Sequence, residues 1–187
     1  MTEPINATIA RLIRQANAAA ADGDYPAAQL LARRVRLPQF GSLFTAGLLH
    51  DTGKIVLNEF VGEQYAEIVR RVTEDGASFL DAEQQVLGYT HPEVGARLAA
   101  SWSLPDSIVH CIRYHHDPTA CSPVEPLVDV IHLADAVCIL LGVGAGDDGL
   151  AYRAQGTVMK RYNLTEADLE VIGAEASGEL RSVQAMF

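Results

Sequence analysis

Helix start and stop signals follow one another along this chain, and no segment alternates apolar and polar residues as a half-buried strand does. Apolar residues recur at helical spacing, and Gly, Pro, Ser, Asp and Thr stand between the periodic segments. A chain patterned in this way has no sheet to build on, so it must bury its apolar faces helix against helix. We therefore predict an all-α fold, a compact bundle of about seven or eight helices.

Two helices are expected before the first strong break in the pattern. Apolar residues at helical spacing predict one over residues 5–16, and Asp24 has the character of an N-cap that opens another. The second helix is expected to end before Pro38, because proline restricts the residue before it. We assign residues 1–39 to an N-terminal helical segment and residues 40–187 to the main domain, and expect a single globular unit.

Further helices are predicted in the main domain. The expected segments are 43–49, 58–75, 78–102 with a new start at Thr90, 106–116, and a last helix that begins after Asn163 or Thr165. Thr90 and Glu93 have the spacing of a capping box. Ser122 and Glu125 have the same spacing and predict the start of a long apolar helix. Residues 142–149, rich in glycine and aspartate, are expected to form a loop.

The composition fits a soluble globular protein and excludes several other classes. Hydrophobic residues make up 49% of the chain and charged residues 20%, which is too apolar for a disordered protein. The three cysteines form no CxxC pair, which favours free thiols in a reducing compartment over a disulfide scaffold. We find neither an apolar run of about 18 residues nor a secretory signal, so we expect a cytoplasmic protein.

The charge balance argues against two kinds of partner. A net charge of −10, from 14 basic and 24 acidic residues, opposes binding to nucleic acid and to anionic membrane surfaces. The one dense basic run, Arg33-Arg34-Val35-Arg36, is explained by a helix end, where cations complement the helix dipole. We therefore expect neither nucleic acid nor a membrane as a partner.

The first histidine of the chain, His50, is followed directly by Asp51. This pair ends the very apolar segment 43–49, so both side chains are expected to start from the core. A buried carboxylate without a partner is costly, and it either takes up a proton or finds a cation. The alternative is that Asp51 only caps the helix that follows.

Asp135 also falls among apolar residues. In a helix it shares a face with Val128, Ile131 and Cys138, so its carboxylate is expected to point inward. In that position it needs a metal ion, an arginine or several hydrogen-bond donors. A structural pairing with arginine is the alternative to a metal ligand.

Three more histidines are candidate ligands. His115 and His116 stand just before a proline that favours a turn, which allows two adjacent rings to face one ion; a pair at the surface is the alternative. His91 opens a helix whose first turn contains a proline. His110 and His132 are interpreted as structural. Imidazole and carboxylate groups together suit first-row divalent ions, and a carboxylate that bridges two ions would form a hydrolase site.

The chain therefore carries four motifs in a fixed order. They are His50-Asp51-Thr52-Gly53-Lys54, His91-Pro92-Glu93-Val94-Gly95-Ala96, His115-His116 and Leu133-Ala134-Asp135-Ala136. Together they resemble the HD superfamily of metal-dependent phosphohydrolases, most closely its HDOD branch, the HD-related output domain of bacterial signalling proteins. The resemblance covers about residues 40–145 and implies an HD-domain-like helical fold.

The resemblance also implies a metal centre and a role for each residue in it. One or two divalent ions would be bound, with Mn, Fe, Ni, Co, Zn and Mg not distinguished. Asp51 would bridge the two ions, and Lys54 would bind the phosphate of a substrate; in an active member both would be catalytic. The implied ligands of one ion are His50 and Asp135, and those of the other are His91, His115 and His116.

Two features depart from the family pattern. HD enzymes carry a further histidine ligand upstream of the HD pair, but residues 1–49 contain no histidine, which leaves one of the two ions short of a ligand. The Gly-Tyr-Pro signature of cyclic di-GMP phosphodiesterases is also missing, since Asp117-Pro118-Thr119 follows the paired histidines. Hydrolysis of cyclic di-GMP is therefore not expected.

Three functions are compatible with these patterns. The first is a metal-binding regulatory domain of the HDOD type in signal transduction. The second is an active metal-dependent phosphohydrolase or phosphodiesterase that acts on a nucleotide or another phosphoester. The third is a metal-free helical protein-interaction domain. The expected partner is a small phosphorylated ligand or a signalling protein. The helix over residues 5–16 is expected to pack either on the core or on a second copy of the chain, and the second arrangement would give a homodimer.

Overall fold

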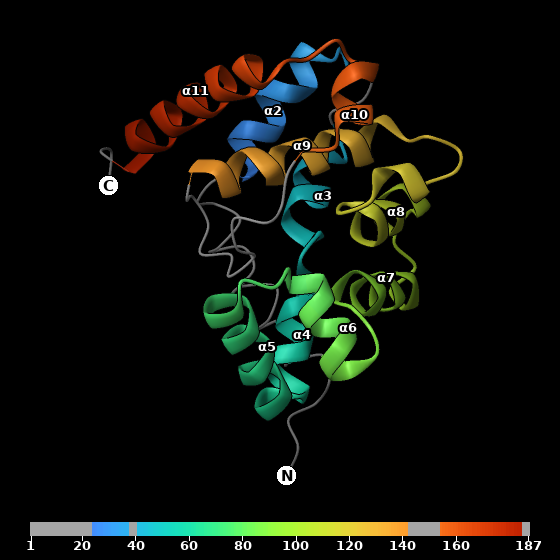
Figure 1. The fold of residues 1–187 in the computed structure, drawn as a ribbon. Helices are drawn as coiled ribbons and strands as arrows, with labels where there is room; N and C mark the ends of the chain where they lie inside the picture. Colours follow the sequence, from blue (N-terminus) through green and yellow to red (C-terminus); the bar gives the residue numbers. More distant parts are fainter. Residues whose placement is uncertain (1–23, 38–40, 142–153, 185–187) are drawn as a thin grey trace.

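A computed structural model describes residues 24–37, 41–141 and 154–184 of the chain, and all regular structure in these residues is helical (Figure 1). The all-α prediction is therefore confirmed. The helices are α2 (Asp24–Arg34), α3 (Leu43–Leu49), α4 (Thr52–Phe60), α5 (Gly62–Asp75), α6 (Phe79–Leu87), α7 (His91–Ser101), α8 (Asp106–Tyr114), α9 (Pro126–Leu141), α10 (Gly156–Arg161) and α11 (Glu166–Gln184), with a short 3-10 turn at Pro118–Ala120. Among these residues, no helix combines the length and apolar character needed to cross a bilayer.

Helix α9 crosses the middle of the molecule (Figure 1). Every residue from Leu127 to Cys138 is buried, as is expected of a helix that is apolar on all sides. Helices α2 and α11 pack along one side of α9, and α3 and α8 contact it from other directions. Helix α9 therefore packs between α2 and α11 on one side and α3 and α8 on others, and the polar side chains in its buried stretch lie in the core.

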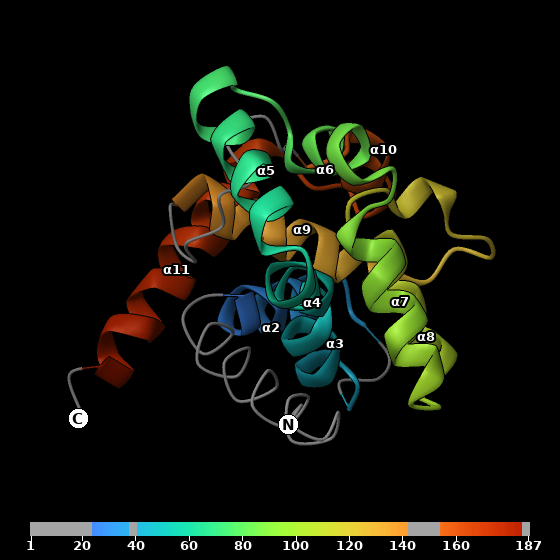
Figure 2. The same ribbon diagram turned by 90° about the horizontal axis from the view of Figure 1, so that it is seen from below.

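Helices α3 and α4 follow one another in nearly the same direction, so the junction between them lies deep in the fold (Figures 1 and 2). Helices α7 and α8 lie side by side along one edge of the molecule, and α4 packs against α7. Helices α5 and α6 form a separate small apolar cluster, made of Ile68, Val72, Phe79 and Ala82. The ends of α3, α6 and α8 and the starts of α4 and α7 are thereby directed toward one region beside α9.

Two glycines allow α4 and α7 to approach each other closely. A Cβ atom on Gly53 would lie 1.9 Å from the carbonyl oxygen of His91, which no packing adjustment of a side chain could relieve. A Cβ atom on Gly95 would lie 2.8 Å from Cγ2 of Ile112 and 3.1 Å from the backbone nitrogen of Gly53. Only glycine fits at position 53, and this close crossing holds Asp51 beside His91.

Several predicted helix ends agree with the structure. Helix α5 ends at Gly76, which adopts the left-handed conformation (φ 68°). The backbone N–H of Thr90 donates to the Glu93 carboxylate at 2.9 Å, as a capping box requires, and α7 begins at the next residue. Thr165 precedes α11, and its hydroxyl accepts a hydrogen bond from the backbone N–H of Asp168.

Other boundaries differ from the prediction. The segment expected as one helix over 58–75 belongs to two helices, because the backbone leaves helical geometry at Val61 (φ −130°). Helix α9 begins at Pro126, later than the Ser122 capping box predicts, and Glu125 supplies its backbone carbonyl to the first turn. Helix α10 was not expected. The predicted helix over 5–16 and the predicted loop over 142–149 lie outside the described residues.

Candidate metal centre

The residues predicted as ligands meet beside α9, and four of them form a compact group. The structure places His50 after α3, Asp51 before α4, His91 at the start of α7, His115 and His116 after α8, and Asp135 within α9. We use the name ligand cluster for Asp51, His91, His115 and His116. One ligand atom of each lies within 4.8 Å of a ligand atom of every other member.

The cluster is organised around one oxygen of Asp51. Nε2 of His91 lies 3.2 Å from Oδ1 of Asp51, and Nε2 of His115 lies 3.5 Å from the same oxygen. Nε2 of His116 lies 3.1 Å from Nε2 of His91. The side chains of His91 and His115 are completely buried, whereas that of Asp51 is 33% exposed, so the cluster opens to solvent on the side of Asp51.

The other ring nitrogen of each buried histidine is held by an acceptor. Nδ1 of His91 donates to the buried carboxylate of Glu83 at 2.8 Å, and Nδ1 of His115 donates to the carbonyl of Ile112 at 2.9 Å. Since these oxygens accept, the hydrogen of a neutral ring lies on Nδ1, and Nε2 presents its lone pair to Asp51. A carboxylate oxygen that faces two such lone pairs is repelled unless a proton or a metal ion lies between them.

This pattern is the one that metal ligands show. A ligating histidine ordinarily donates its second ring N–H to a carboxylate or a backbone carbonyl, which fixes the tautomer and the direction of the ring. Three imidazoles and one carboxylate suit a first-row divalent ion. The residues present therefore fit the metal ion that the sequence predicts.

The charges around Asp51 favour the protonation states that bind a metal. Burial raises the pKa of Asp51, but Lys54, His50 and the contacts with His115 and His91 together outweigh it, so the pKa lies well below its usual value. Burial lowers the pKa of His115 to about 3. Burial, and next the neighbouring His115, lower the pKa of His116 well below its usual value. Asp51 is thus ionised at neutral pH, and both adjacent histidines are neutral.

His91 differs from the other two histidines of the cluster. Burial and Lys54 lower its pKa, but the hydrogen bonds to Asp51 and Glu83 outweigh them, so that the pKa of His91 is raised. In the absence of a metal ion, a proton between His91 and Asp51 relieves the contact of their facing atoms. Metal binding at this position therefore competes with that proton.

His50 and Asp135 lie next to the ligand cluster at longer distances. Nε2 of His50 is 3.6 Å from Oδ2 of Asp51 and 3.9 Å from Oδ1 of Asp135, while its Nδ1 donates to the carbonyl of Gly47 at 2.7 Å. Oδ2 of Asp135 is 3.8 Å from Nδ1 of His116. The structure therefore brings all six predicted ligands together, with these two at the margin.

The second oxygen of Asp51 faces Lys54. Nζ of Lys54 donates to Oδ2 of Asp51 at 3.0 Å and lies 5.0 Å from the centre of the Phe79 ring. Asp51 does occupy the N-cap position of α4, but its side chain makes no capping hydrogen bond. Its carboxylate is directed instead to the histidines on one side and to the ammonium group on the other.

Sequence reasoning missed Glu83, the fully buried carboxylate that holds His91. A signal was present, because Glu83 follows Ala82 and lies one turn after Phe79, on the buried face of α6. The same reasoning that identified Asp135 among apolar neighbours applies to it.

His132, interpreted as structural, bonds to the backbone on both sides. Its Nδ1 donates to the carbonyl of His115 at 2.7 Å, and its Nε2 accepts from the backbone N–H of Gln155 at 2.9 Å. Because both ring nitrogens have backbone partners, His132 positions His115 from behind and does not face the cluster.

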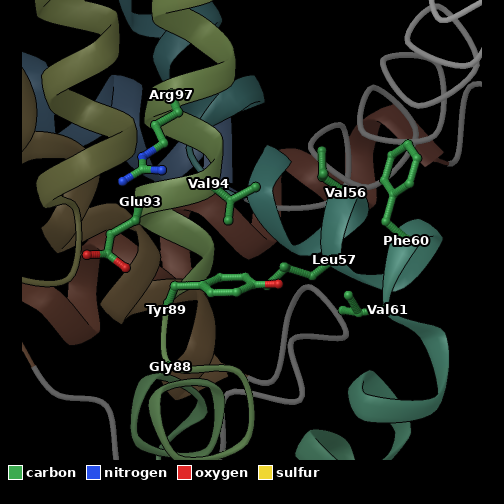
Figure 3. A pocket seen from close by; sticks show the side chains of 9 residues that line it. All are labelled: Val56, Leu57, Phe60, Val61, Gly88, Tyr89, Glu93, Val94 and Arg97. Carbon is green, nitrogen blue, oxygen red and sulfur yellow. The ribbon is translucent and has the colours of Figure 1, made fainter.

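A pocket of about 500 Å³ lies between α4 and α7 (Figure 3). Its wall is largely apolar, with Tyr89 reaching across toward Leu57 and the polar side chains of Glu93 and Arg97 on the α7 side. No member of the ligand cluster lines it, so this pocket is separate from the candidate metal centre.

A helical domain with a histidine–aspartate centre of this kind belongs to the HD class, and a comparison with known families identifies the branch. The model of the HDOD domain matches residues 6–118, so the chain belongs to the HDOD family. This match begins within the N-terminal segment and ends before α9.

Solved structures support the same fold. An HDOD domain protein of unknown function from Geobacter sulfurreducens is 29% identical, with a TM-score of 0.71 over 89% of this chain and 59% of its own. A Marinobacter aquaeolei VT8 protein, thought to act in signal transduction, is 22% identical, with a TM-score of 0.72 over 89% of this chain and 38% of its own. A Shewanella amazonensis SB2B protein, thought to be a phosphohydrolase, is 24% identical, with a TM-score of 0.63 over 87% and 59% of the two chains.

A sequence relative is much longer than this chain. An uncharacterized protein from Treponema pallidum is 32% identical over 99 residues, which are 49% of this chain and 18% of the relative. The chain thus spans only part of the proteins that it matches.

Proposed function

We propose that this HDOD domain binds a divalent metal ion through Asp51, His91, His115 and His116 and acts as a regulatory domain in signal transduction. The observation that carries the proposal is the orientation of His91 and His115. Each ring ties Nδ1 to an acceptor and turns Nε2 to the same oxygen of Asp51.

The number of ligands favours regulation over catalysis. Four protein ligands would complete the shell of a tetrahedral ion such as Zn²⁺, which is the arrangement of structural zinc sites, whereas catalytic zinc sites keep a position for water. A second ion would depend on His50, Asp135 and the shared Asp51, since residues 1–49 supply no histidine. The likeness to a Marinobacter protein thought to act in signal transduction agrees with a regulatory role.

The exposed side of the centre supports a proposal about the chemistry of the partner. Lys54 and Asp51 face solvent there, with 13% and 33% of their side chains exposed, while the imidazoles lie behind them. An ammonium group at the opening suits a small phosphorylated ligand or an acidic site on a signalling protein. The net charge of −10 opposes binding to nucleic acid and to anionic membranes. From the sequence pattern we also infer a cytoplasmic location.

A second candidate function is metal-dependent hydrolysis of a phosphoester. Lys54 favours it, because its ammonium group, 3.0 Å from Asp51, could also neutralise a phosphate beside the metal. A bound metal centre supplies an activated water and stabilises the charge on a phosphoryl group. The Shewanella neighbour thought to be a phosphohydrolase has the same fold.

Metal content tests the first proposal. The protein is stripped with a chelator, loaded with Mn²⁺ or Fe²⁺ and analysed for bound metal. We expect about one ion per chain in the wild type and a loss of at least about tenfold in affinity in His91→Ala and His115→Ala. Arg113→Ala removes an exposed side chain from the same helix as His115 and should leave Mn²⁺ binding unchanged. Fewer than about 0.2 ions per chain, or equal losses in all three variants, would contradict the proposal.

Hydrolysis separates the two functions. The loaded protein is incubated with bis-p-nitrophenyl phosphate and Mn²⁺ and compared with Asp51→Ala, which lacks the shared ligand. A regulatory domain shows the same background rate in both proteins. A wild-type rate more than about tenfold above that of Asp51→Ala establishes the phosphohydrolase instead.

A further inference from the structure

A second group of metal-ligand side chains lies outside the ligand cluster. His110 belongs to α8, Cys121 follows the 3-10 turn, and Glu125 directly precedes α9. One ligand atom of each lies within 4.8 Å of the ligand atoms of the other two. Cys121 and Glu125 lie four residues apart in the segment between the 3-10 turn and α9, and the packing of α8 against α9 brings His110 to them.

Within this group, His110 and Glu125 are in short contact, whereas the thiol of Cys121 makes only a long one. Nδ1 of His110 lies 2.5 Å from Oε1 of Glu125, and the thiol of Cys121 makes a long contact of 3.5 Å to the carbonyl of Pro123. Cys121 is buried, whereas the side chains of His110 and Glu125 are 34% and 23% exposed. The sulfur therefore lies in the less exposed part of the group, beside two side chains that reach solvent.

The group is independent of the candidate metal centre. His110 and His115 are five residues apart, so their side chains leave α8 about 140° apart around its axis. No residue is shared between the two groups. The sulfur atom also distinguishes them, since the ligand cluster contains only nitrogen and oxygen ligands.

We propose that His110, Cys121 and Glu125 form a second metal site, which takes Zn²⁺. Thiolate, imidazole and carboxylate are the ligands that Zn²⁺ binds in proteins, at about 2.0–2.3 Å and in tetrahedral geometry. With three protein ligands, the fourth position is left for water. Coordination releases the thiol proton and replaces the hydrogen bond between His110 and Glu125, whose nearest atoms separate by roughly 0.7 Å to reach tetrahedral spacing.

Charge favours a cation at this position. Burial, and next the carboxylate of Glu125, raise the pKa of Cys121, so the sulfur keeps its proton when no cation is present. A divalent ion between the sulfur of Cys121 and the carboxylate of Glu125 offsets the effects of burial and of the negative charge, and it stabilises the thiolate. The bound ion would join α8 to the start of α9. His115 and His116 directly follow α8, and Asp135 lies within α9.

The test uses the full chain stripped of metal, loaded with Co²⁺ and kept reduced with a phosphine. A cobalt–thiolate bond gives charge-transfer absorption in the near ultraviolet, which a centre of imidazoles and a carboxylate does not. We expect this absorption in the wild type and in His91→Ala, and its loss in Cys121→Ser. Adding Zn²⁺ to the wild type should displace the bound Co²⁺ and abolish the absorption. Cys138→Ser, which changes a buried thiol elsewhere on α9, is the matched control and should keep the absorption.

The outcomes are distinct from those of the first proposal. Retention of the absorption in His91→Ala supports the second site even if the ligand cluster binds no metal. No absorption in the wild type, or the same absorption in Cys121→Ser, would overturn the proposal and leave His110 and Glu125 as a hydrogen-bonded pair. Circular dichroism checks the folding of each variant; if Cys121→Ser does not fold, His110→Gln replaces it, with an expected loss of at least about tenfold in Co²⁺ affinity.

Discussion

Glu83 accepts two hydrogen bonds from His91, one from the backbone N–H and one from Nδ1, and both are 2.8 Å long. Both residues are completely buried. The carboxylate in the middle of α6 therefore fixes the first residue of α7 in position, in ring orientation and in tautomer. A residue eight positions away from His91 thus decides how its Nε2 faces Asp51.

Replacing Glu83 by glutamine should weaken metal binding with little change in size. The amide carries no charge and can present an N–H group to Nδ1, so the ring loses its fixed tautomer. We expect a loss of about 10–100-fold in Mn²⁺ affinity, measured by isothermal titration. Glu93→Gln is the control, because Glu93 caps the same helix from an exposed position and should alter stability alone. Equal affinities of Glu83→Gln and the wild type would show that Glu83 does not position the ligand.

The crossing of α4 and α7 should not tolerate a methyl group at position 53. In Gly53→Ala the new Cβ would overlap the carbonyl of His91, so the two helices must separate and Asp51 must leave the cluster. We expect a lower melting temperature and a loss of Mn²⁺ binding of at least about tenfold. Gly47→Ala is the matched control, because the nearest atom outside its helix lies 3.9 Å away, an ordinary contact with Ile131. Comparable metal binding in the two variants would contradict this role of Gly53.

The helical fold could be predicted from the sequence wherever a strong local signal existed. Thr90 and Gly76 mark helix ends through side-chain and backbone chemistry that acts within one turn. The break at Val61 was missed although Gly62 follows it, because this glycine begins α5 and does not end a helix in the left-handed conformation as Gly76 does. Helix α10 is only six residues long, too short for an apolar period to appear.

The candidate centre was predictable in part for a related reason. Asp135 stands out because a carboxylate among apolar residues needs a partner, but α9 is buried on every side, so the same argument applies to Asp129. The arginine pairing considered for Asp135 occurs at Asp129, which bonds to Arg161 and Tyr162. Helix α10 brings Arg161 to Asp129, and Asp135 meets histidines instead. No local sequence pattern encodes where α10 lies relative to α9.

The pairing of Asp129 should make a measurable contribution to stability. Asp129 is 1% exposed, and it accepts hydrogen bonds from Arg161 and, at 2.8 Å, from the hydroxyl of Tyr162. Arg161→Ala leaves the buried carboxylate with the hydroxyl but without a cation. We expect the free energy of unfolding to fall by about 1–3 kcal/mol in urea denaturation. Lys160→Ala, which removes an exposed charge from the same helix, should change it by less than about 0.5 kcal/mol. Similar effects in both variants would show that Arg161 acts only through net charge.

Asp168 should make stability depend on pH in a defined range. It accepts hydrogen bonds from the Thr165 hydroxyl at 2.6 Å and from Arg34 at 2.9 Å, and these lower the pKa of Asp168 to about 2. Because this pKa lies below the value of about 3.9 in an unfolded chain, the carboxylate stabilises the folded state above that pH. The contribution is lost as the pH falls from about 4 through about 2.

Asp168→Asn tests this dependence. We expect its melting temperature to lie a few degrees below that of the wild type at pH 6, and the difference to shrink between about pH 4 and pH 2. Arg34→Ala should remove only part of the difference, because the arginine side chain is 56% exposed and its attraction is screened by salt, whereas the bond to Thr165 persists. Arg33→Ala removes the same charge one residue away and should not change the pH profile. A constant difference between Asp168→Asn and the wild type across this pH range would mean that the ionised carboxylate does not stabilise the joint between α2 and α11.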